Sequence, residues 1–445
     1  VSGGKVNVAE NMIINSDTKI NGGTVNVVGN VRLQRESINS AGEKSYSETY
    51  GGRLFMENEA DTLNIGGSLV IEEYYGQSVF SAGTIDLKGN LIQYNRYKSV
   101  FNAGANHKVI LSGDKAQKVE FNNVSSIFGN LVLKNTSEEG VSFTKYSNWN
   151  KLDKGDSILN LAEGQYLGYT LTKDEVIEGD FNLLGDVLNL NGHNLTIKGN
   201  LLQSGGTIEV NGGTLTVEGD YKLVSGENGQ CRSKLIMDGK HVSGEETIED
   251  TDKVIVKGTF ATNSIYSHES YLTSGTMELS GDFIQYGDGT NFKTGGTHEV
   301  ILKGEKLQNI SFGGQSSNFN NLKIQNKSEE GVKVQTVAVV TGTLYETDTK
   351  VVNGKNIYLA SGAKVINEEG KTEWSHDLTL SGERTLTEDM KVKGSLYINY
   401  GMDMSGHNLD VGKSLYINDY KYGSTFNVSG GKVNVAENMI INSDT

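Results

Sequence analysis

Proline is missing from all 445 residues of this chain, although an average usage of about 5% would give roughly 22. Because proline cannot donate a backbone hydrogen bond, its absence fits a structure in which nearly every backbone N–H pairs with a neighbouring strand. The absence also excludes collagen and proline-rich linkers. Cysteine is reduced to Cys231 alone, which excludes a framework of intramolecular disulfides but does not decide the cellular compartment.

Basic clusters and long apolar runs are missing as well. The net charge is −15 and the sequence pI is about 5.0, so we expect neither nucleic acid nor an anionic membrane as a partner. No apolar run approaches the roughly 20 residues that a membrane span needs. No signal peptide is present, but Val1 is not a natural start, and we therefore expect the sequence to be an excerpt of a longer chain.

Glycine, by contrast, is abundant, with 56 residues against roughly 31 for average usage. A motif of apolar, any, Gly, polar and apolar residues places Gly179, Gly199 and Gly219 at regular steps (199 − 179 = 20 and 219 − 199 = 20). Between these glycines lie short alternating runs of leucine and β-branched residues, separated by turn pairs such as Asn-Gly and Gly-Gly. A period of about 20 residues that holds two or three short strands is typical of a solenoid coil.

The chain is therefore predicted to be all-β, a single elongated parallel β-solenoid (β-helix) with coils of about 20 residues and strand ladders along its whole length. Roughly 21 coils at a spacing of about 4.8 Å would form a rod of roughly 100 Å. Inward side chains such as Leu195 and Ile197 would stack into a continuous core. Asparagines at the corners would form amide ladders between coils, the examples being Asn7, Asn26, Asn194 and Asn408.

Stretches without strand alternation are predicted to be loops that project from the solenoid wall. Long insertions are tolerated on surfaces, and none of these stretches has the helical period with caps that would predict a helix. The predicted loops are residues 34–50, 146–156, 226–232, 241–251 and 340–373.

An exact internal repeat sets the predicted domain organisation. Residues 1–18, VSGGKVNVAENMIINSDT, recur without a change at residues 428–445 (428 − 1 = 427). Structural constraint alone would tolerate many substitutions, so we infer a tandemly repeated unit of 427 residues. Residues 1–427 are then one full unit of solenoid, and residues 428–445 are the start of the next identical unit.

The unit is itself a degenerate double. GTIDLKGNLIQ at Gly83 matches GTMELSGDFIQ at Gly275, and HKVILSGDKAQKVEF at His107 matches HEVILKGEKLQNISF at His298. We predict one half at about residues 1–187 together with 402–427, and the other at residues 188–401.

The phrases LNLNGHNLTIKGNLLQSGGTIEVNGGTLTVEGDY and HKVILSGDKAQKVEFNN resemble repeats in very large extracellular proteins of Clostridium-like Firmicutes. They are also similar, more loosely, to parallel β-helices of the pectin-lyase and filamentous-haemagglutinin type. The resemblance covers most of the chain, and it implies a right-handed β-solenoid that is secreted or attached to the cell surface. It assigns no functional residue.

Catalytic chemistry is not predicted. Polysaccharide lyases and hydrolases need clustered carboxylates, often with Lys or Arg, on one strand face. Here no Asp-Asp pair occurs, and acidic residues are scattered through turns such as the SEEG sequences at Ser137 and Ser328, whose duplication indicates a scaffold. We therefore predict no catalytic residue and no enzyme activity.

No cofactor or metal site is predicted either. His107 and His298 occupy equivalent coil positions, as do His193 and His407, whereas His241, His268 and His376 are isolated, and none has the neighbour spacing of a zinc site. Neither the EF-hand pattern nor the calcium-binding nonapeptide repeat occurs, although calcium in Asp- and Asn-rich turns stays an open alternative.

The single cysteine and the tyrosines are the remaining candidates for a functional role. Cys231 precedes Arg232, which would lower the thiol pKa slightly, but we favour an incidental thiol that is exposed or half-buried. Tyrosines gather near equivalent coils of the two halves, and stacking inside the solenoid is favoured over outward stacking on sugars or on another protein. These tyrosines are Tyr74, Tyr75, Tyr94, Tyr97, Tyr266, Tyr271 and Tyr286.

The sequence thus favours a structural function, the shaft of a tandem-repeat extracellular fibre or adhesin. The expected partners are neighbouring copies of the unit stacked end to end, together with surface polysaccharide or other cells. The alternative is a carbohydrate-binding or polysaccharide-degrading β-helix. Tandem duplication favours the shaft, because repeating a long unit lengthens a rod but adds little to an enzyme.

Overall fold

The computed structural model describes the chain except for residues 35, 39–40, 42–43, 47–51, 73–77, 95–100, 123–125, 145–146, 240, 244–245, 249–251, 315, 419–424 and 443–445. The described residues are all-β, and the helical structure among them is the 3-10 helix η1 (Gly354–Asn356). Parallel strands stack as a β-solenoid of about 18 turns, with about 22 residues per turn across the described part of the chain. The predicted fold class is confirmed. At about 4.8 Å per turn the contour along the stacked turns is about 85 Å, shorter than the predicted rod.

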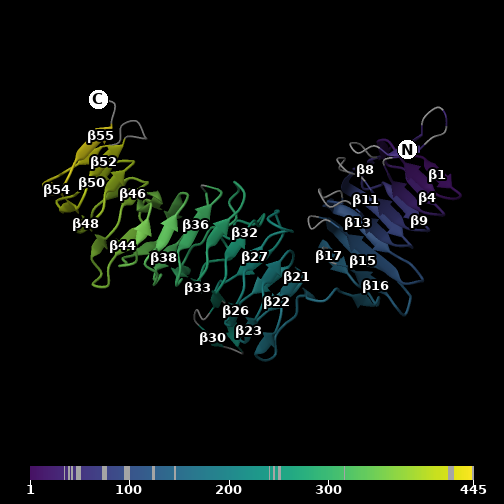
Figure 1. Cartoon of the computed structure of the whole chain (residues 1–445), viewed down its shortest axis with the longest axis horizontal. Helices are drawn as coiled ribbons and strands as arrows, with labels where there is room; N and C mark the ends of the chain where they lie inside the picture. Colours follow the sequence, from purple (N-terminus) through teal and green to yellow (C-terminus); the bar gives the residue numbers. More distant parts are fainter. Residues whose placement is uncertain are drawn as a thin grey trace.

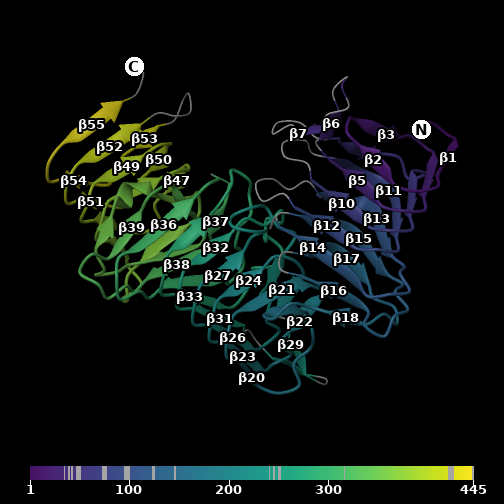
Figure 2. The same ribbon diagram turned by 45° about the vertical axis from the view of Figure 1, so that its right-hand side comes forward.

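Two stacks of coils, which we call the N-terminal arm and the C-terminal arm, meet at an elbow and give the molecule a V shape (Figures 1 and 2). The first sheet of the N-terminal arm contains β1 (Lys5–Val8), β4 (Thr24–Val27), β9 (Thr62–Ile65), β11 (Val79–Leu87), β13 (Ala103–Leu111), β15 (Ile127–Leu133) and β17 (Asn148–Asp153), with β3 (Thr18–Ile20) and β8 (Leu54–Met56) beside this path. Its second sheet contains β2 (Met12–Ile14), β5 (Val31–Leu33), β10 (Leu69–Ile71), β12 (Leu91–Gln93), β14 (Gln117–Phe121), β16 (Val141–Phe143) and β18 (Leu159–Asn160).

The C-terminal arm starts with two long sheets and a short one. One long sheet contains β19 (Gln165–Leu167), β21 (Phe181–Gly185), β24 (Leu201–Gln203), β27 (Tyr221–Leu223), β32 (Phe260–Thr262), β34 (Phe283–Gln285), β36 (Gln308–Phe312), β39 (Val332–Val334) and β42 (Val351–Val352). The other contains β20 (Glu175–Ile177), β23 (Asn194–Ile197), β26 (Thr214–Val217), β31 (Lys253–Val256), β33 (Thr276–Leu279), β35 (Glu299–Leu302), β38 (Asn321–Ile324), β41 (Thr343–Tyr345) and β44 (Lys364–Ile366). The short sheet contains β22 (Val187–Asn189), β25 (Thr207–Glu209) and β28 (Lys234–Ile236).

Three further sheets complete this arm toward the C-terminus. The longest contains β37 (Asn318–Phe319), β40 (Ala338–Val340), β43 (Ile357–Leu359), β46 (Leu378–Leu380), β49 (Leu396–Ile398), β52 (Leu415–Asn418) and β55 (Met439–Asn442). The others contain β45 (Thr372–Trp374), β48 (Met390–Val392), β51 (Leu409–Val411) and β54 (Val433–Val435), and β47 (Arg384–Thr385), β50 (Met402–Asp403) and β53 (Phe426–Asn427).

The elbow interrupts the strand ladders that we expected along the whole rod. The first sheet ends at β17, a new sheet begins at β19, and β17 contacts β21 without pairing with it in a ladder. Trp149 packs against Gly185, where an added Cβ would come within 2.4 Å of the indole Nε1. Buried apolar residues accordingly form two clusters among the described residues, one in each arm, and Leu184 of β21 packs into the cluster of the N-terminal arm.

The repeated motif marks a corner at which successive coils come very close. A Cβ on Gly199 would lie 2.7 Å from the carbonyl carbon of Gly179, and a Cβ on Gly219 would lie 2.7 Å from the carbonyl oxygen of Gly199. The N–H of Gly199 donates to Gly179 (3.1 Å), and that of Gly219 donates to Gly199 (3.0 Å). Glycine is required here because backbone stacks on backbone. This contact explains the period of 20 residues.

The polar residue after each motif glycine bonds the next coil. The Asp180 carboxylate accepts the backbone N–H of Asn200 (2.7 Å), and the Asn200 side chain accepts the N–H of Asp220 (2.9 Å). The N-terminal arm repeats the pattern, with the side chain of Asn30, which follows Gly29, accepting the N–H of Ser68 (2.7 Å). These bonds satisfy corner N–H groups that lie between the strand ladders.

Aromatic rings stack inside the coils along the axis, but they belong mostly to phenylalanine, and none of the tyrosines predicted to stack there is among the buried rings of the described residues. The buried rings are Phe80, Phe101, Phe121 and Phe128 in the N-terminal arm, and Tyr221, Phe260, Phe283, Phe292 and Phe319 in the C-terminal arm. Neighbouring centroids lie 4.8 to 6.0 Å apart, within the range of favourable aromatic pairs.

Two of the predicted loops are part of the wall instead. Residues 146–156 contain β17, and residues 340–373 contain β41 to β44, η1 and part of β45. The strands β41 to β44 have only two or three residues each, which is too short for alternation to be recognised in the sequence. Antiparallel hairpins lie within two other predicted loops, β6 (Glu36–Ile38) with β7 (Lys44–Tyr46), and β29 (His241–Ser243) with β30 (Glu246–Ile248).

Candidate assembly surface at the two ends of the solenoid

The duplicated acidic turns are structural. In the turn at Ser137, the Asn135 side-chain oxygen accepts both the N–H and the hydroxyl of Ser137, at 2.8 and 2.7 Å. The Ser137 hydroxyl in turn accepts the N–H of Gly140 (2.9 Å). The turn at Ser328 has the same bonds.

The members of each histidine pair have similar burial, although Nδ1 of His298 lies 2.7 Å from the carbonyl oxygen of Ser274 and the ring of His107 has no hydrogen-bond partner among the described residues. His107 and His298 are fully buried, and desolvation lowers the pKa of His107 to about 4. At the surface, Nδ1 of His193 lies 3.7 Å from the Asp174 carboxylate, and Nδ1 of His407 lies 3.8 Å from that of Asp389.

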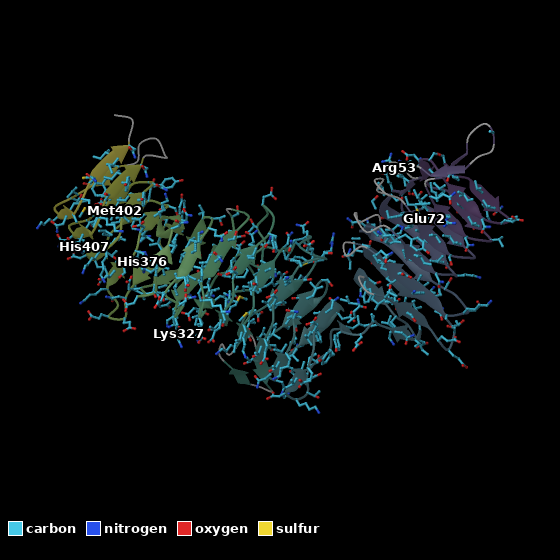
Figure 3. All side chains as sticks on the ribbon, viewed as in Figure 1. Arg53, Glu72, Lys327, His376, Met402 and His407 are labelled. Atoms are coloured by element: carbon cyan, nitrogen blue, oxygen red, sulfur yellow. The ribbon has the colours of Figure 1, made fainter. Side chains whose placement is uncertain are left out.

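The remaining histidines do not gather into a site. His268 is buried, and its Nδ1 lies 3.0 Å from the carbonyl oxygen of Asn291. His376, labelled on the C-terminal arm in Figure 3, is half-buried, and its Nε2 lies 3.3 Å from the carbonyl oxygen of Thr347. The side chain of His241 lies outside the described residues. Among the described residues, no group of three or more His, Cys, Asp or Glu side chains is placed to hold a metal ion.

Cys231 differs from the prediction. Its side chain is buried, with 2% exposed, and burial raises the thiol pKa to about 11. The effect of burial outweighs any effect of the neighbouring arginine, because a thiolate in an apolar core loses its hydration. The thiol is therefore a core side chain rather than a reactive group.

The predicted tyrosine cluster is only partly described. Tyr94 is exposed, Tyr266, Tyr271 and Tyr286 are half-buried, and Tyr74, Tyr75 and Tyr97 lie outside the described residues. The Lys234 ammonium lies 4.6 and 5.1 Å from the ring centroids of Tyr266 and Tyr271. These two rings thus already hold a cation from the same chain.

One pair of carboxyl groups, which the sequence did not reveal, has contrasting environments. Burial raises the pKa of Glu346, whose Oε2 accepts the N–H of Ser375 (2.9 Å). A hydrogen bond from Lys393 lowers the pKa of Glu373, whose Oε1 lies 3.2 Å from Lys393 Nζ and 3.4 Å from Lys391 Nζ. Contrasting carboxyl groups are what acid–base catalysis uses, although structural ion pairs produce them too.

The two copies of the repeated segment occupy opposite ends of the solenoid, at the tips of the two arms (Figure 1). Residues 1–18 contain β1 and β2, and residues 428–445 contain β54 and β55 at the equivalent positions. Among the described residues, β1 and β2 of the first copy pair with β4 and β5 of the coil that follows, and β54 and β55 of the second copy pair with β51 and β52 of the coil that precedes. Each copy therefore leaves one coil edge open among the described residues.

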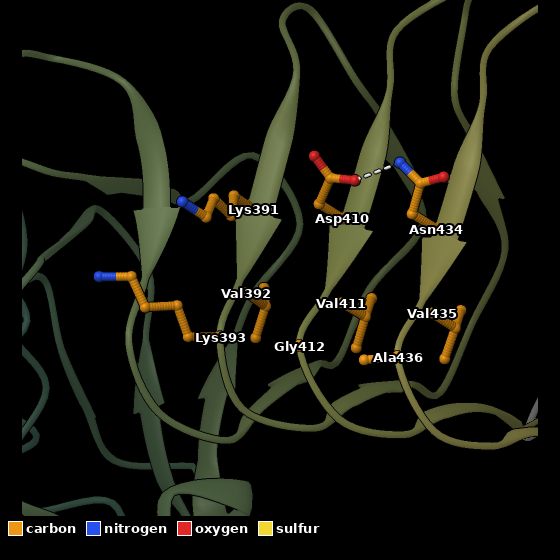
Figure 4. Close-up of a pocket in the computed structure, with 9 residues that line it drawn as sticks. All are labelled: Lys391, Val392, Lys393, Asp410, Val411, Gly412, Asn434, Val435 and Ala436. Carbon is orange, nitrogen blue, oxygen red and sulfur yellow. Dashed lines mark hydrogen bonds between the residues drawn. The ribbon is translucent and has the colours of Figure 1, made fainter.

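The asparagine in the middle of each copy shows how the two edges fit. In the first copy, the side-chain oxygen of Asn7 accepts a hydrogen bond from Asn26 (2.8 Å), whose own oxygen accepts one from Asn64 (2.8 Å). In the second copy, the equivalent Asn434 donates its side-chain N–H to Asp410 (Figure 4). One copy uses the acceptor of the amide, and the other uses the donor.

The backbone follows the same division. In the second copy, Ala436 and Glu437 donate their N–H groups to the preceding coil, and Asn438 accepts through its carbonyl. In the first copy, Val8 and Glu10 accept through their carbonyls from the following coil, and Met12 donates its N–H. Among the described residues, each of these backbone atoms is bonded to a neighbouring coil in one copy, and the equivalent atom of the other copy has no such bond, so one coil can make both sets of bonds at once.

Burial shows the same asymmetry. Ile14 is 3% exposed, whereas the identical Ile441 is 59% exposed. Val392, Val411 and Val435 line a hollow of about 290 Å³ next to the last coil (Figure 4). Ile441 at the C-terminal end, and Val6 at the N-terminal end (38% exposed), thus lack the cover that an adjacent coil provides in the interior.

No protein-family model matches the chain, and no curated protein or solved structure was found to be similar to it. The resemblance to clostridial surface proteins therefore stays a prediction. No described helix is long and apolar enough to cross a membrane.

Proposed function

We propose that this chain is a segment of the shaft of an extracellular fibre or adhesin, in which successive units continue one β-solenoid. The observation that carries this proposal is the division of hydrogen-bonding atoms between the two copies of the repeated segment. In a coil that is both the end of one unit and the start of the next, Asn434 and Asn7 are the same residue. Its side-chain oxygen would accept a hydrogen bond from the following coil, as Asn7 does, and its side-chain N–H would donate one to the preceding coil, as Asn434 does. The valines of this coil would be covered on both sides.

Other features support a structural function. The duplicated acidic turns bond within the wall. The net charge of −15 disfavours side-by-side association of rods, whereas burial of the core favours association along the axis. We propose no nucleic-acid partner and no membrane insertion for this segment. The extracellular location, and polysaccharide or other cells as the target of the fibre, rest on the resemblance described above.

Electron microscopy of chains with one, two and three units tests the proposal. Each added unit should extend the contour by about 85 Å, from about 18 turns at about 4.8 Å. Because the elbow belongs to the unit, it should recur once per unit and produce a zigzag with rigid joints.

A matched two-unit variant carries Val433→Asp and Val435→Asp at the internal joint. Charged residues in the core of that coil should convert the rigid joint into a flexible one without changing the arms. If the unchanged two-unit chain already shows arms joined at variable angles at this joint, the proposal is wrong.

The alternative function, a β-helix that binds or degrades polysaccharide, is favoured by one observation. Glu346 has the raised pKa of a general acid, and Glu373 beside it stays ionised. Depolymerisation of pectin, glucan or peptidoglycan by the chain, abolished in Glu346→Gln and retained in Glu330→Gln in a solvated turn, would establish this function. We expect neither protein to release fragments.

A further inference from the structure

We infer that two molecules of this 445-residue chain join by coil exchange, in which residues 428–445 of one molecule replace residues 1–18 of the next. The inference rests on the proposed continuity of the solenoid, and it adds a partner outside the covalent chain. The partner is a second copy of the chain, and its docking surface is the edge formed by β4 and β5.

The exchange needs no new side-chain fit, because the two segments are identical. In one molecule, β1 lies on β4 with Val6 beside Val25 and Val8 beside Val27. In the exchanged joint, Val433 and Val435 take these places. Likewise, β2 lies on β5 with Ile14 beside Leu33, and Ile441 takes that place.

The bonds on the other side of the incoming segment already exist. Asn434 donates to Asp410, while its side-chain oxygen stands where Asn7 accepts from Asn26. After the exchange, Asn434 would therefore bond both coils. The exposed apolar side chains of the last coil, Met439 and Ile441, would gain the cover of a following coil.

The free energy favours the joint for two reasons. Contacts on β4 and β5 are replaced one for one, so nothing is lost there. The open edges of residues 428–445 in one molecule and of residues 1–18 in the next are replaced by one ladder that continues through the joint. The displaced residues 1–18 regain conformational entropy, and this gain offsets part of the translational entropy that is lost on association.

Simple end-to-end stacking of the two copies fits less well. The position above Glu10 is occupied by Gly29 in the molecule, and a Cβ there would lie 2.8 Å from the Glu10 carbonyl oxygen and 2.6 Å from the Asn11 side chain. In coil exchange, Gly29 of the next molecule lies against Glu437. In stacking, Glu10 of the next molecule lies against Glu437 instead. Stacking would therefore press a side chain into backbone and put two carboxylates next to each other.

Disulfide trapping in the full chain separates the two arrangements. Coil exchange brings position 434 of one molecule beside position 26 of the next, and stacking brings it beside position 7. Residues in register on adjacent parallel strands are within the reach of a disulfide. On mild oxidation, Asn434→Cys with Asn26→Cys should give a ladder of linked oligomers, at least tenfold more than Asn434→Cys with Asn7→Cys.

Controls keep the test decisive. The single variants Asn434→Cys and Asn26→Cys show the background, and Cys231 is buried and common to all proteins. In the linked oligomers, trypsin should cleave after Lys5 at least tenfold faster than in the monomer, because residues 1–18 are released.

Linkage mainly through position 7 would show stacking, and absence of linkage at both positions would show that the chains do not join. Either result overturns coil exchange. If the two-unit chain still forms rigid joints, the proposed function stands. Flexible joints in that chain would instead overturn the proposed function, whatever the cross-linking shows.

Discussion

The N-terminal and C-terminal arms contain one hydrogen-bond network twice, 191 residues apart (308 − 117 = 191). The side-chain oxygen of Gln117 accepts the N–H of Gly113 (2.8 Å), and its amide donates to the carbonyls of Leu87 (3.0 Å) and Gly89 (2.7 Å). Asn135 donates to the same Gln117 oxygen (3.0 Å).

In the C-terminal arm, Gln308 accepts from Gly304 (2.6 Å), donates to Leu279 (3.0 Å) and Gly281 (2.8 Å), and accepts from Asn326 (2.9 Å). The two networks thus match bond for bond. Each one ties a turn to the equivalent corners of the coil before it and the coil after it.

The outward pairs of these coils differ between the arms. Asp86 of the N-terminal arm bonds the Ser112 hydroxyl, whereas the equivalent Glu278 lies 3.0 Å from both Lys303 and Lys253. Water can satisfy outward groups, but a buried turn has no substitute for its own side-chain partners. The buried hydrogen-bond network is therefore the same in both arms, whereas the side-chain pairs on the outer face differ between them.

The largest predicted effect comes from breaking the network. Gln117→Leu or Gln308→Leu leaves buried backbone groups without partners and should destabilise its own arm by about 3 kcal/mol or more. The chain has two tryptophans, Trp149 in the N-terminal cluster and Trp374 in the C-terminal one, so Trp→Phe backgrounds report urea unfolding of each arm separately. A loss below about 1 kcal/mol in either arm would contradict the equivalence.

A pH titration sharpens the comparison of the buried histidines. Ring atoms of His107 have no hydrogen-bond partner among the described residues, and the pKa of His107 is lowered to about 4 by burial, against about 6.5 in the unfolded chain. Protons therefore bind the unfolded state first. The stability is fully present above about pH 6.5, falls as the pH decreases, and levels off below about 4, with a loss of about 3 kcal/mol.

His107→Phe, which fits beside Phe80 and Phe101, should flatten this pH dependence in the N-terminal arm alone. The C-terminal arm should keep its own, because burial also lowers the pKa of His268 to about 4. Urea midpoints between pH 7 and pH 5 measure both slopes. An unchanged slope in the N-terminal arm of the variant would show that another group titrates.

A smaller effect is expected for the turn hydroxyls. Ser137→Ala and Ser328→Ala each remove a bond to an asparagine (2.7 Å in both turns) and a bond from a glycine N–H. Each should cost about 1 kcal/mol in its own arm. Thr136→Ala, beside the first turn, serves as the control, and an effect of the same size there would show that the serine bonds are not the cause.

The outward pairs should matter least. Glu278→Gln should cost less than about 1 kcal/mol, and the loss should shrink as salt is raised, because partly exposed ion pairs are screened. Asp86 bonds a hydroxyl and, among the described residues, no ammonium group, so the stability change caused by Asp86→Asn should not depend on salt. If the stability changes of both variants depended on salt to the same extent, the predicted difference between the ion pairs of Glu278 and the hydrogen bond of Asp86 would be wrong.

The sequence by itself was enough to predict the solenoid, the glycine corners and the duplication. The backbone of Gly179 leaves no room for a Cβ on Gly199, and the backbone of Gly199 leaves none on Gly219, so glycine recurs at this corner and the period is visible in the sequence. Identity of residues 1–18 with 428–445 also predicted a repeating joint. These are local or periodic constraints, and they act within one coil and its neighbour.

Tertiary structure alone decided the elbow, the burial of Cys231, and the strands within residues 340–373. Each depends on which coil packs against which, as Trp149 does against Gly185, and short strands carry no alternation that would reveal this. The contrast between Glu346 and Glu373 likewise arises from neighbours on other coils. The division of donors and acceptors between Asn7 and Asn434 also appears only in three dimensions, because identical residues differ solely in which coil lies beside them.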